Sequence, residues 1–100
     1  MTSKLYIMLR SPEEHCDLEV IDRLSGEEGR AAMLFEDAVY FSVMEKRGKN
    51  LLDRVDRAYV ISDDLRSRGI ASHLMEGFEE VDYPKAVDLI MEEYGQTVTI

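Results

Sequence analysis

The single cysteine, Cys16, is the one side chain of this sequence that could act as a nucleophile in sulfur chemistry. A thiolate attacks sulfur without a cofactor, and a helix amino terminus or a neighbouring His15 would favour the thiolate form. Glu13, Glu14 and Asp17 act in the opposite direction, because nearby negative charge raises the pKa of a thiol. A small buried cysteine is an equally good interpretation of the sequence alone.

The cysteine count also limits the chemistry and the compartment. One cysteine in 100 residues permits no intramolecular disulfide and no cysteine-rich metal site. His15 and His73 lie far apart in the sequence, and neither belongs to a metal-ligand pattern. No glycine-rich phosphate loop and no nucleophile elbow is present. We therefore expect a protein of the reducing cytoplasm that has no metal and no cofactor.

Two acidic pairs, at 36–37 and 63–64, follow apolar runs that are typical of buried strands. Open α/β sheets hold their sites at the carboxyl ends of strands, so these four carboxylates could bind Mg²⁺ there. Helix capping explains both pairs more simply, because negative charge stabilises the first turn of a helix. We favour capping.

The elements that must position these residues alternate between strands and helices. Ser11, Pro12 and Glu14 form a helix-start pattern, which predicts a first helix from Pro12 to about Gly26, with Cys16 one turn inside it and partly exposed. Strands are expected at 4–9, 31–35, 57–61, within 77–82 and at 97–100. Further helices are expected at 38–44, at 63–69 after a Ser62 cap, and from Pro84 to Gly95, with a charged connection at 46–56.

This alternation predicts an α/β domain with a mostly parallel five-stranded sheet covered by helices on both faces. The length, with 45% hydrophobic and 33% charged residues, predicts one soluble domain over 1–100, without a signal peptide or membrane segment. The net charge of −9 argues against direct, tight nucleic-acid binding. Seven of the twelve basic residues nevertheless lie between Lys46 and Arg68.

Four segments in a fixed order resemble the DsrH/TusB family. They are L-R-S-P at 9–12, L-F-E-D-A-V-Y at 34–40, Y-x-I-x-x-D-L-x-x-R-G at 59–69 and V-D-Y-x-x-x-V-D-L at 81–89. The resemblance implies a flavodoxin-like three-layer fold and a hetero-oligomer with DsrE/TusD-like and DsrF/TusC-like subunits. It further implies sulfur transfer as cysteine persulfide, toward 2-thiolation of a tRNA wobble uridine or within sulfur oxidation. Cys16 lies in the region where some DsrH members carry a cysteine.

Three functions follow from these observations. The first is a sulfur-relay subunit that accepts sulfur on Cys16, a carrier or structural subunit rather than a stand-alone enzyme. The second is a scaffold protein of the same fold without chemistry, and the third is a receiver-like or nucleotide-binding module centred on Asp63 and Asp64. Apolar residues at 39–43 exceed what one helix face can bury, so we expect pairing with a sister subunit or a homo-oligomer.

Overall fold

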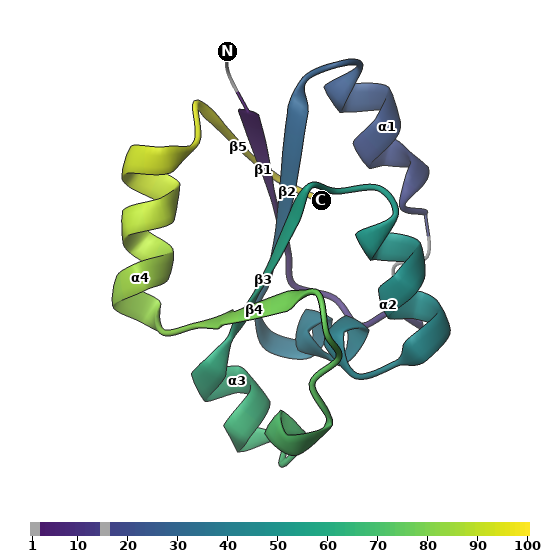
Figure 1. Cartoon of the computed structure of the whole chain (residues 1–100), viewed down its shortest axis with the longest axis vertical. Helices are drawn as coiled ribbons and strands as arrows, with labels where there is room; N and C mark the ends of the chain where they lie inside the picture. Colours follow the sequence, from purple (N-terminus) through teal and green to yellow (C-terminus); the bar gives the residue numbers. More distant parts are fainter. Residues whose placement is uncertain (1–2, 15–16) are drawn as a thin grey trace.

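A parallel sheet forms the centre of the computed structural model, which describes residues 3–14 and 17–100 (Figure 1). Its spatial order is β4-β3-β2-β1-β5. The strands are β1 (Ser3–Met8), β2 (Gly29–Leu34), β3 (Arg57–Ile61), β4 (Phe78–Val81) and β5 (Gln96–Thr99). All four pairings are parallel, as in Tyr6 opposite Ala32 and opposite Val98. The five predicted strands and the parallel sheet are confirmed.

Helices cover both faces of this sheet. They are α1 (Glu19–Ser25), η1 (Glu36–Ser42, a 3₁₀ helix), α2 (Glu45–Leu52), α3 (Ser62–Ser67), η2 (Ala71–His73, a 3₁₀ helix), α4 (Tyr83–Asp88) and its π-helical continuation η3 (Leu89–Glu93). The predicted flavodoxin-like arrangement of three α/β/α layers is confirmed (Figure 1). No helix of the described residues is long and apolar enough to cross a membrane.

Two hydrophobic clusters lie on opposite faces of the sheet, because neighbouring strand residues point in opposite directions. On one face, residues such as Tyr6 contact α1, η1, α2 and α3. On the other face, Leu5 and Met33 pack with Ala86 and Leu89 of α4 and η3. Among the described residues, α4 and η3 are the only helices that contribute to this second cluster.

The first helix begins later than its start pattern predicts. Pro12 to Glu14 form a turn in which the Glu14 N–H donates to the Ser11 carbonyl at 3.1 Å, and α1 begins at Glu19. A capping pattern does not offset the cost of helix nucleation without apolar packing, and in the described residues after Pro12 the next buried side chain is Leu18. The predicted helix start at Pro12 is therefore wrong, and Cys16, expected one turn inside that helix, lies outside the described residues, three positions before α1 begins.

The charged stretch at 46–56 is mostly helix α2, not a connection. The buried residues of α2 are Gly48 and Leu51, whereas Lys46 and Lys49 are exposed. Gly48 allows the helix to lie against η1, because a Cβ there would come within 2.5 Å of the Phe41 carbonyl oxygen. The periodicity is hard to detect in the sequence, because a glycine contributes part of the buried face.

The expected excess of exposed apolar residues at 39–43 is also wrong. Val39 and Phe41 are 0% and 1% exposed, although they belong to a 3₁₀ helix that begins at Glu36 instead of an α-helix from residue 38. Both side chains belong to the cluster on the α1 and α2 face of the sheet. The argument for self-association through this segment therefore has no support.

The two later helices α3 and α4 differ from the prediction, α3 at its start and α4 in the side that faces the sheet. Ser62 is the first residue of α3 and not its cap, because the chain is still extended at Ile61. The helical spacing of Tyr83, Val87, Ile90 and Tyr94 predicts that these residues form the inner side of α4. This prediction is wrong at Tyr83 and Val87, which are exposed. The buried position is Ala86, whose small side chain allows α4 to lie close to the sheet.

Candidate functional site

The carboxyl ends of β1 to β4 meet at one edge of the sheet, as parallel pairing requires. The segment 9–14, the acidic pair 36–37, the pair 63–64 and the amino terminus of α4 all follow directly from these strand ends. The Phe35 N–H donates to the Met8 carbonyl at 2.9 Å, so the exits of β1 and β2 are joined. The predicted placement of both acidic pairs at this edge is confirmed.

The two acidic pairs engage partners across elements. Asp64 accepts a hydrogen bond from the Glu36 N–H at 2.8 Å, and Arg68 donates to Asp37 at 2.9 Å. Both pairs lie in the first turns of η1 and α3, as the capping interpretation expects, although neither helix receives a side-chain hydrogen bond from the residue just before it. Among residues 3–14 and 17–100, no group of three His, Cys, Asp or Glu side chains could hold a metal ion.

Tyr83 joins this cluster from α4. Its hydroxyl donates to Asp64 at 3.3 Å, and its ring lies 6.3 Å from that of Phe35. Desolvation raises the pKa of Tyr83, and the negative charge of Asp64 raises it further. Tyr83 therefore stays a neutral hydrogen-bond donor that ties the start of α4 to α3.

Cys16 and His15 lie outside the described residues, but the chain on both sides of them is anchored. On the amino-terminal side, Pro12 is buried, and its carbonyl accepts a hydrogen bond from Arg47 of α2 at 3.2 Å. This hydrogen bond joins the segment after β1 to α2, the helix that the sequence analysis expected to be a charged connection.

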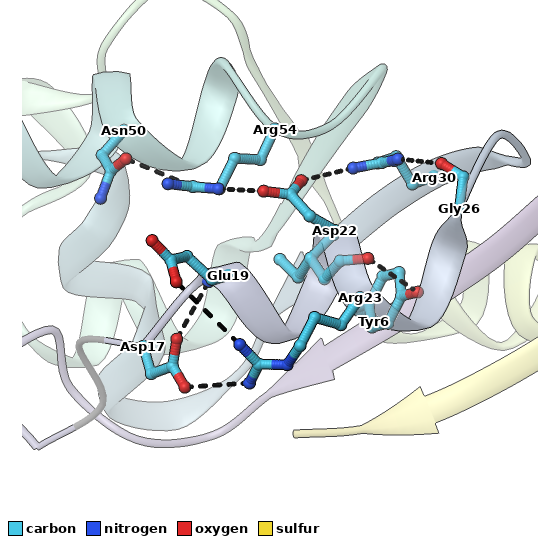
Figure 2. A network of polar contacts seen from close by, with 10 residues as sticks. Tyr6, Asp17, Glu19, Asp22, Arg23, Gly26, Arg30, Asn50 and Arg54 are labelled. Carbon is cyan, nitrogen blue, oxygen red and sulfur yellow. Dashed lines mark hydrogen bonds and ion pairs between the residues drawn. The ribbon is translucent and has the colours of Figure 1, made fainter.

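On the carboxyl-terminal side, Asp17 holds the start of α1 (Figure 2). One carboxylate oxygen of Asp17 accepts from the Glu19 N–H at 3.2 Å, and the other accepts from Arg23 at 3.2 Å. Aspartate commonly bonds the backbone two residues further on, so this anchor has a local signal in the sequence. The hydrogen bond from Arg47 to Pro12 joins residues 35 positions apart and has no such local signal in the sequence.

Asp22 fixes α1 to the rest of this face of the protein (Figure 2). Arg30 of β2 donates to one oxygen of Asp22 at 2.5 Å, and Arg54, which follows α2, pairs with the other oxygen. Arg30 also donates to the Gly26 carbonyl at 2.6 Å. The helix that follows Cys16 in sequence is thus held to β2 and to the end of α2.

A small cavity lies beside the segment that leads to Cys16. Its volume is about 230 Å³, and its walls come from the segment 11–13, from Tyr40 of η1 and from Met44. Small-molecule sites usually occupy about 300–1,000 Å³, so this cavity fits a side chain better than a cofactor. His73, the other histidine, lies exposed in η2.

Comparison with known proteins identifies the family. The family model described as "DsrH like protein" matches residues 10–96. The proteins named "Protein TusB" from Yersinia pestis (strain Pestoides F) and Yersinia pseudotuberculosis serotype O:1b (strain IP 31758) are 30% identical over 93 residues, which is 92% of this chain and 96% of theirs.

A solved structure has the same fold. The ychN protein from E. coli superimposes with a TM-score of 0.78 over the whole of both chains, at 13% identity. Such low identity is evidence of the fold alone. From the family match and the TusB relatives, the chain belongs to the DsrH family.

Proposed function

We propose that this protein is a subunit of a sulfur-relay complex that handles sulfur as cysteine persulfide. Membership of the DsrH family carries the proposal, and it supports a sulfur-relay subunit in general. In the finer form of the proposal, the protein assembles with DsrE/TusD-like and DsrF/TusC-like subunits in the cytoplasm. The sulfur then goes to 2-thiolation of a tRNA wobble uridine or enters sulfur oxidation.

Cys16 is the proposed sulfur acceptor. The Cys16 thiolate attacks the outer sulfur of a partner persulfide, R–S–SH, so that Cys16–S–SH forms and R–S⁻ leaves. The step conserves electrons and needs no cofactor. Support comes from the neighbours of the cysteine, because Glu14 and Asp17 are exposed and lie at a surface that a partner subunit can approach.

The observed start of α1 removes the sequence argument that the amino terminus of this helix favours the Cys16 thiolate. Because α1 begins at Glu19, the backbone amides of its first turn lie beyond Cys16 in the sequence. The acidic residues Glu13, Glu14 and Asp17 remain, and of these Asp17 is paired with Arg23. We therefore propose that a partner, through the position of its persulfide and its leaving group, sets the rate of transfer.

Persulfide transfer followed by intact-mass analysis tests this role. A DsrE/TusD-like partner is loaded with persulfide and mixed with the protein, and the mass of one added sulfur atom is expected on this chain. Since Cys16 is the only cysteine, the added atom is assigned without digestion. Cys16→Ser should abolish the gain, whereas Ser11→Ala, in the same segment, should keep it.

A non-catalytic scaffold is the second candidate, favoured by the acidic residues around Cys16. It predicts that the complex assembles and retains full activity with Cys16→Ser, and that no sulfur is added to this chain. That pair of results would remove the chemical role of Cys16 and leave the structural one.

A further inference from the structure

The outer face of α4 and η3, which we define as Tyr83, Val87 and Met91, is exposed and apolar. Their exposed fractions are 43%, 55% and 76%, and they are three of the five large exposed hydrophobic residues in the part of the chain that the structure describes. The inner residues Ala86 and Leu89 already fill the contact with the sheet. This helix therefore has two apolar sides, of which its own fold uses one.

The position of α4 leaves its outer face open. Figure 1 shows α4 alone on its side of the sheet, with α1 and α2 on the opposite side. Val87 and Met91 belong to neither hydrophobic cluster of the described residues. Contiguous apolar residues on a surface, rimmed by polar ones, are typical of a protein contact.

The charge around this face restricts what can cover it. Between Glu79 and Glu93 the chain carries six acidic residues and one basic residue, Lys85, and all of the acidic ones are exposed. Within the described residues, the only ion pair from this stretch joins Glu79 to Arg57, at 4.0 Å. On α4 and η3 themselves, Asp88, Glu92 and Glu93 are exposed and outnumber Lys85, so the polar rim of this face is negatively charged.

This negative rim excludes several occupants. Two copies of the chain that met through α4 would place like charges opposite each other, which costs free energy. Nucleic acid and anionic membrane surfaces would be repelled for the same reason. A protein surface with an apolar centre and a rim of lysine and arginine complements both the apolar centre of this face and the negative charge of its rim.

We propose that the outer face of α4 and η3 is the docking surface for a sister subunit that presents an apolar patch ringed by Lys and Arg. This inference rests on the proposed function for the identity of the partner. Tyr83 and Met91 suit the role, because aromatic and methionine side chains are enriched at the centres of interfaces. The acidic rim steers association, which makes the contact sensitive to salt.

Charge placed within the apolar centre tests the surface. The protein is co-expressed with its DsrE/TusD-like and DsrF/TusC-like subunits, and the dissociation constant of the complex is measured for Val87→Glu and Met91→Glu. Each variant is expected to weaken the complex by about tenfold or more, because an unpaired carboxylate is buried on docking. Leu24→Glu is the matched control, since Leu24 of α1 is 43% exposed on the opposite face.

Charge reversal on the rim provides a second measurement. Glu92→Lys with Glu93→Lys should slow association and reduce its dependence on salt. Glu27→Lys, at an exposed site after α1, should change neither quantity. Because all of these positions are exposed, the variants should keep the unfolding transition of the wild type.

The outcomes separate the two proposals. If the wild-type complex forms and the α4 variants bind as tightly as Leu24→Glu, the docking surface is overturned while the proposed function stands. If the wild-type chains do not associate at all, the sister-subunit part of the proposed function fails, and the docking inference fails with it. Self-association that Met91→Glu abolishes would overturn the choice of a sister subunit.

Discussion

The carboxylate of Asp64, in α3, caps η1 by accepting a hydrogen bond from the backbone N–H of Glu36 at 2.8 Å. Glu36 has φ of 50°, the left-handed region that residues other than glycine rarely adopt. Glu36 lies two residues after the end of β2, and Asp64, which lies three residues after the end of β3, accepts the hydrogen bond of its backbone N–H. The exits of the two strands are thus fixed to each other.

Replacement of Asp64 should destabilise the protein. Asp64→Ala leaves the Glu36 N–H without its acceptor and removes the acceptor of the Tyr83 hydroxyl, so the free energy of unfolding should fall by about 1–3 kcal/mol. Asp64→Asn, which keeps one oxygen, should cost less. Urea denaturation measures both, and Asp63→Ala is the control because Asp63 is exposed. Equal costs at the two positions would contradict the capping role.

Gly48 should not tolerate a larger side chain. A Cβ at this position would come within 2.5 Å of the Phe41 carbonyl oxygen, which belongs to the backbone and cannot move aside easily. The gain in helix propensity for Gly48→Ala is about 1 kcal/mol, whereas overpacking costs about 1–3 kcal/mol. We expect a net loss of unfolding free energy by chemical denaturation, with Lys46→Ala in the same helix near neutral. A stabilised Gly48→Ala would show that α2 does not pack as described.

Alkaline pH should weaken the fold through Tyr94. Its pKa is raised above the ordinary 10.0, first by burial and then by the hydrogen bond with the Tyr59 hydroxyl at 2.8 Å. Above pH 10 the unfolded chain loses this proton while the native protein keeps it. The stabilisation is therefore complete below pH 10 and is lost as the pH rises toward the native pKa.

Unfolding free energies at pH 9 and 11, together with tyrosinate absorbance, measure this effect. Tyr94→Phe keeps the edge-to-face contact with the Tyr59 ring and should remove part of the pH dependence. An unchanged dependence in this variant would assign the alkaline loss to other groups.

Free tRNA should not bind this chain tightly, in spite of the basic residues between Lys46 and Arg68. Four of these seven form ion pairs within the protein: Lys49 with Glu45, Arg54 with Asp22, Arg57 with Glu79 and Arg68 with Asp37. The net charge of −9 then dominates at long range. Fluorescence anisotropy with labelled tRNA should give a dissociation constant weaker than about 1 μM in moderate salt. Binding with a dissociation constant of about 1 μM or tighter that is lost on charge reversal of Lys46 and Arg47 would contradict this prediction.

Strands were predictable from this sequence because a strand buried on both faces is a short run of apolar residues, as at 31–35 and 57–61. The buried faces of the helices were harder to predict from the sequence. The position of α1 depends on where Leu18 meets the core, and α2 buries a glycine. On α4, Val87 has the expected helical spacing but faces outward, because Ala86 packs more closely on the sheet.

The candidate site was predictable only where it is local. The acidic pairs could be placed because each follows a strand directly, and in a parallel sheet those ends share an edge. The partners of these acidic residues could not be predicted. The hydrogen bond between Asp64 and Glu36 joins residues 28 positions apart, and that between Arg68 and Asp37 joins residues 31 positions apart. The anchoring of Pro12 by Arg47 is likewise a product of tertiary packing.

The strand order has a consequence for synthesis on the ribosome. β1 to β4 can pair one after another as they emerge, but β5 must return to β1, where Val98 lies opposite Tyr6. Until α4 and β5 have been made, the apolar side chains of Leu5 and Met33 on the α4 face have no cover. A nascent chain that lacks these last elements exposes the apolar side chains on this face of the sheet, and we expect the need for a chaperone or an early partner to be greatest at this stage.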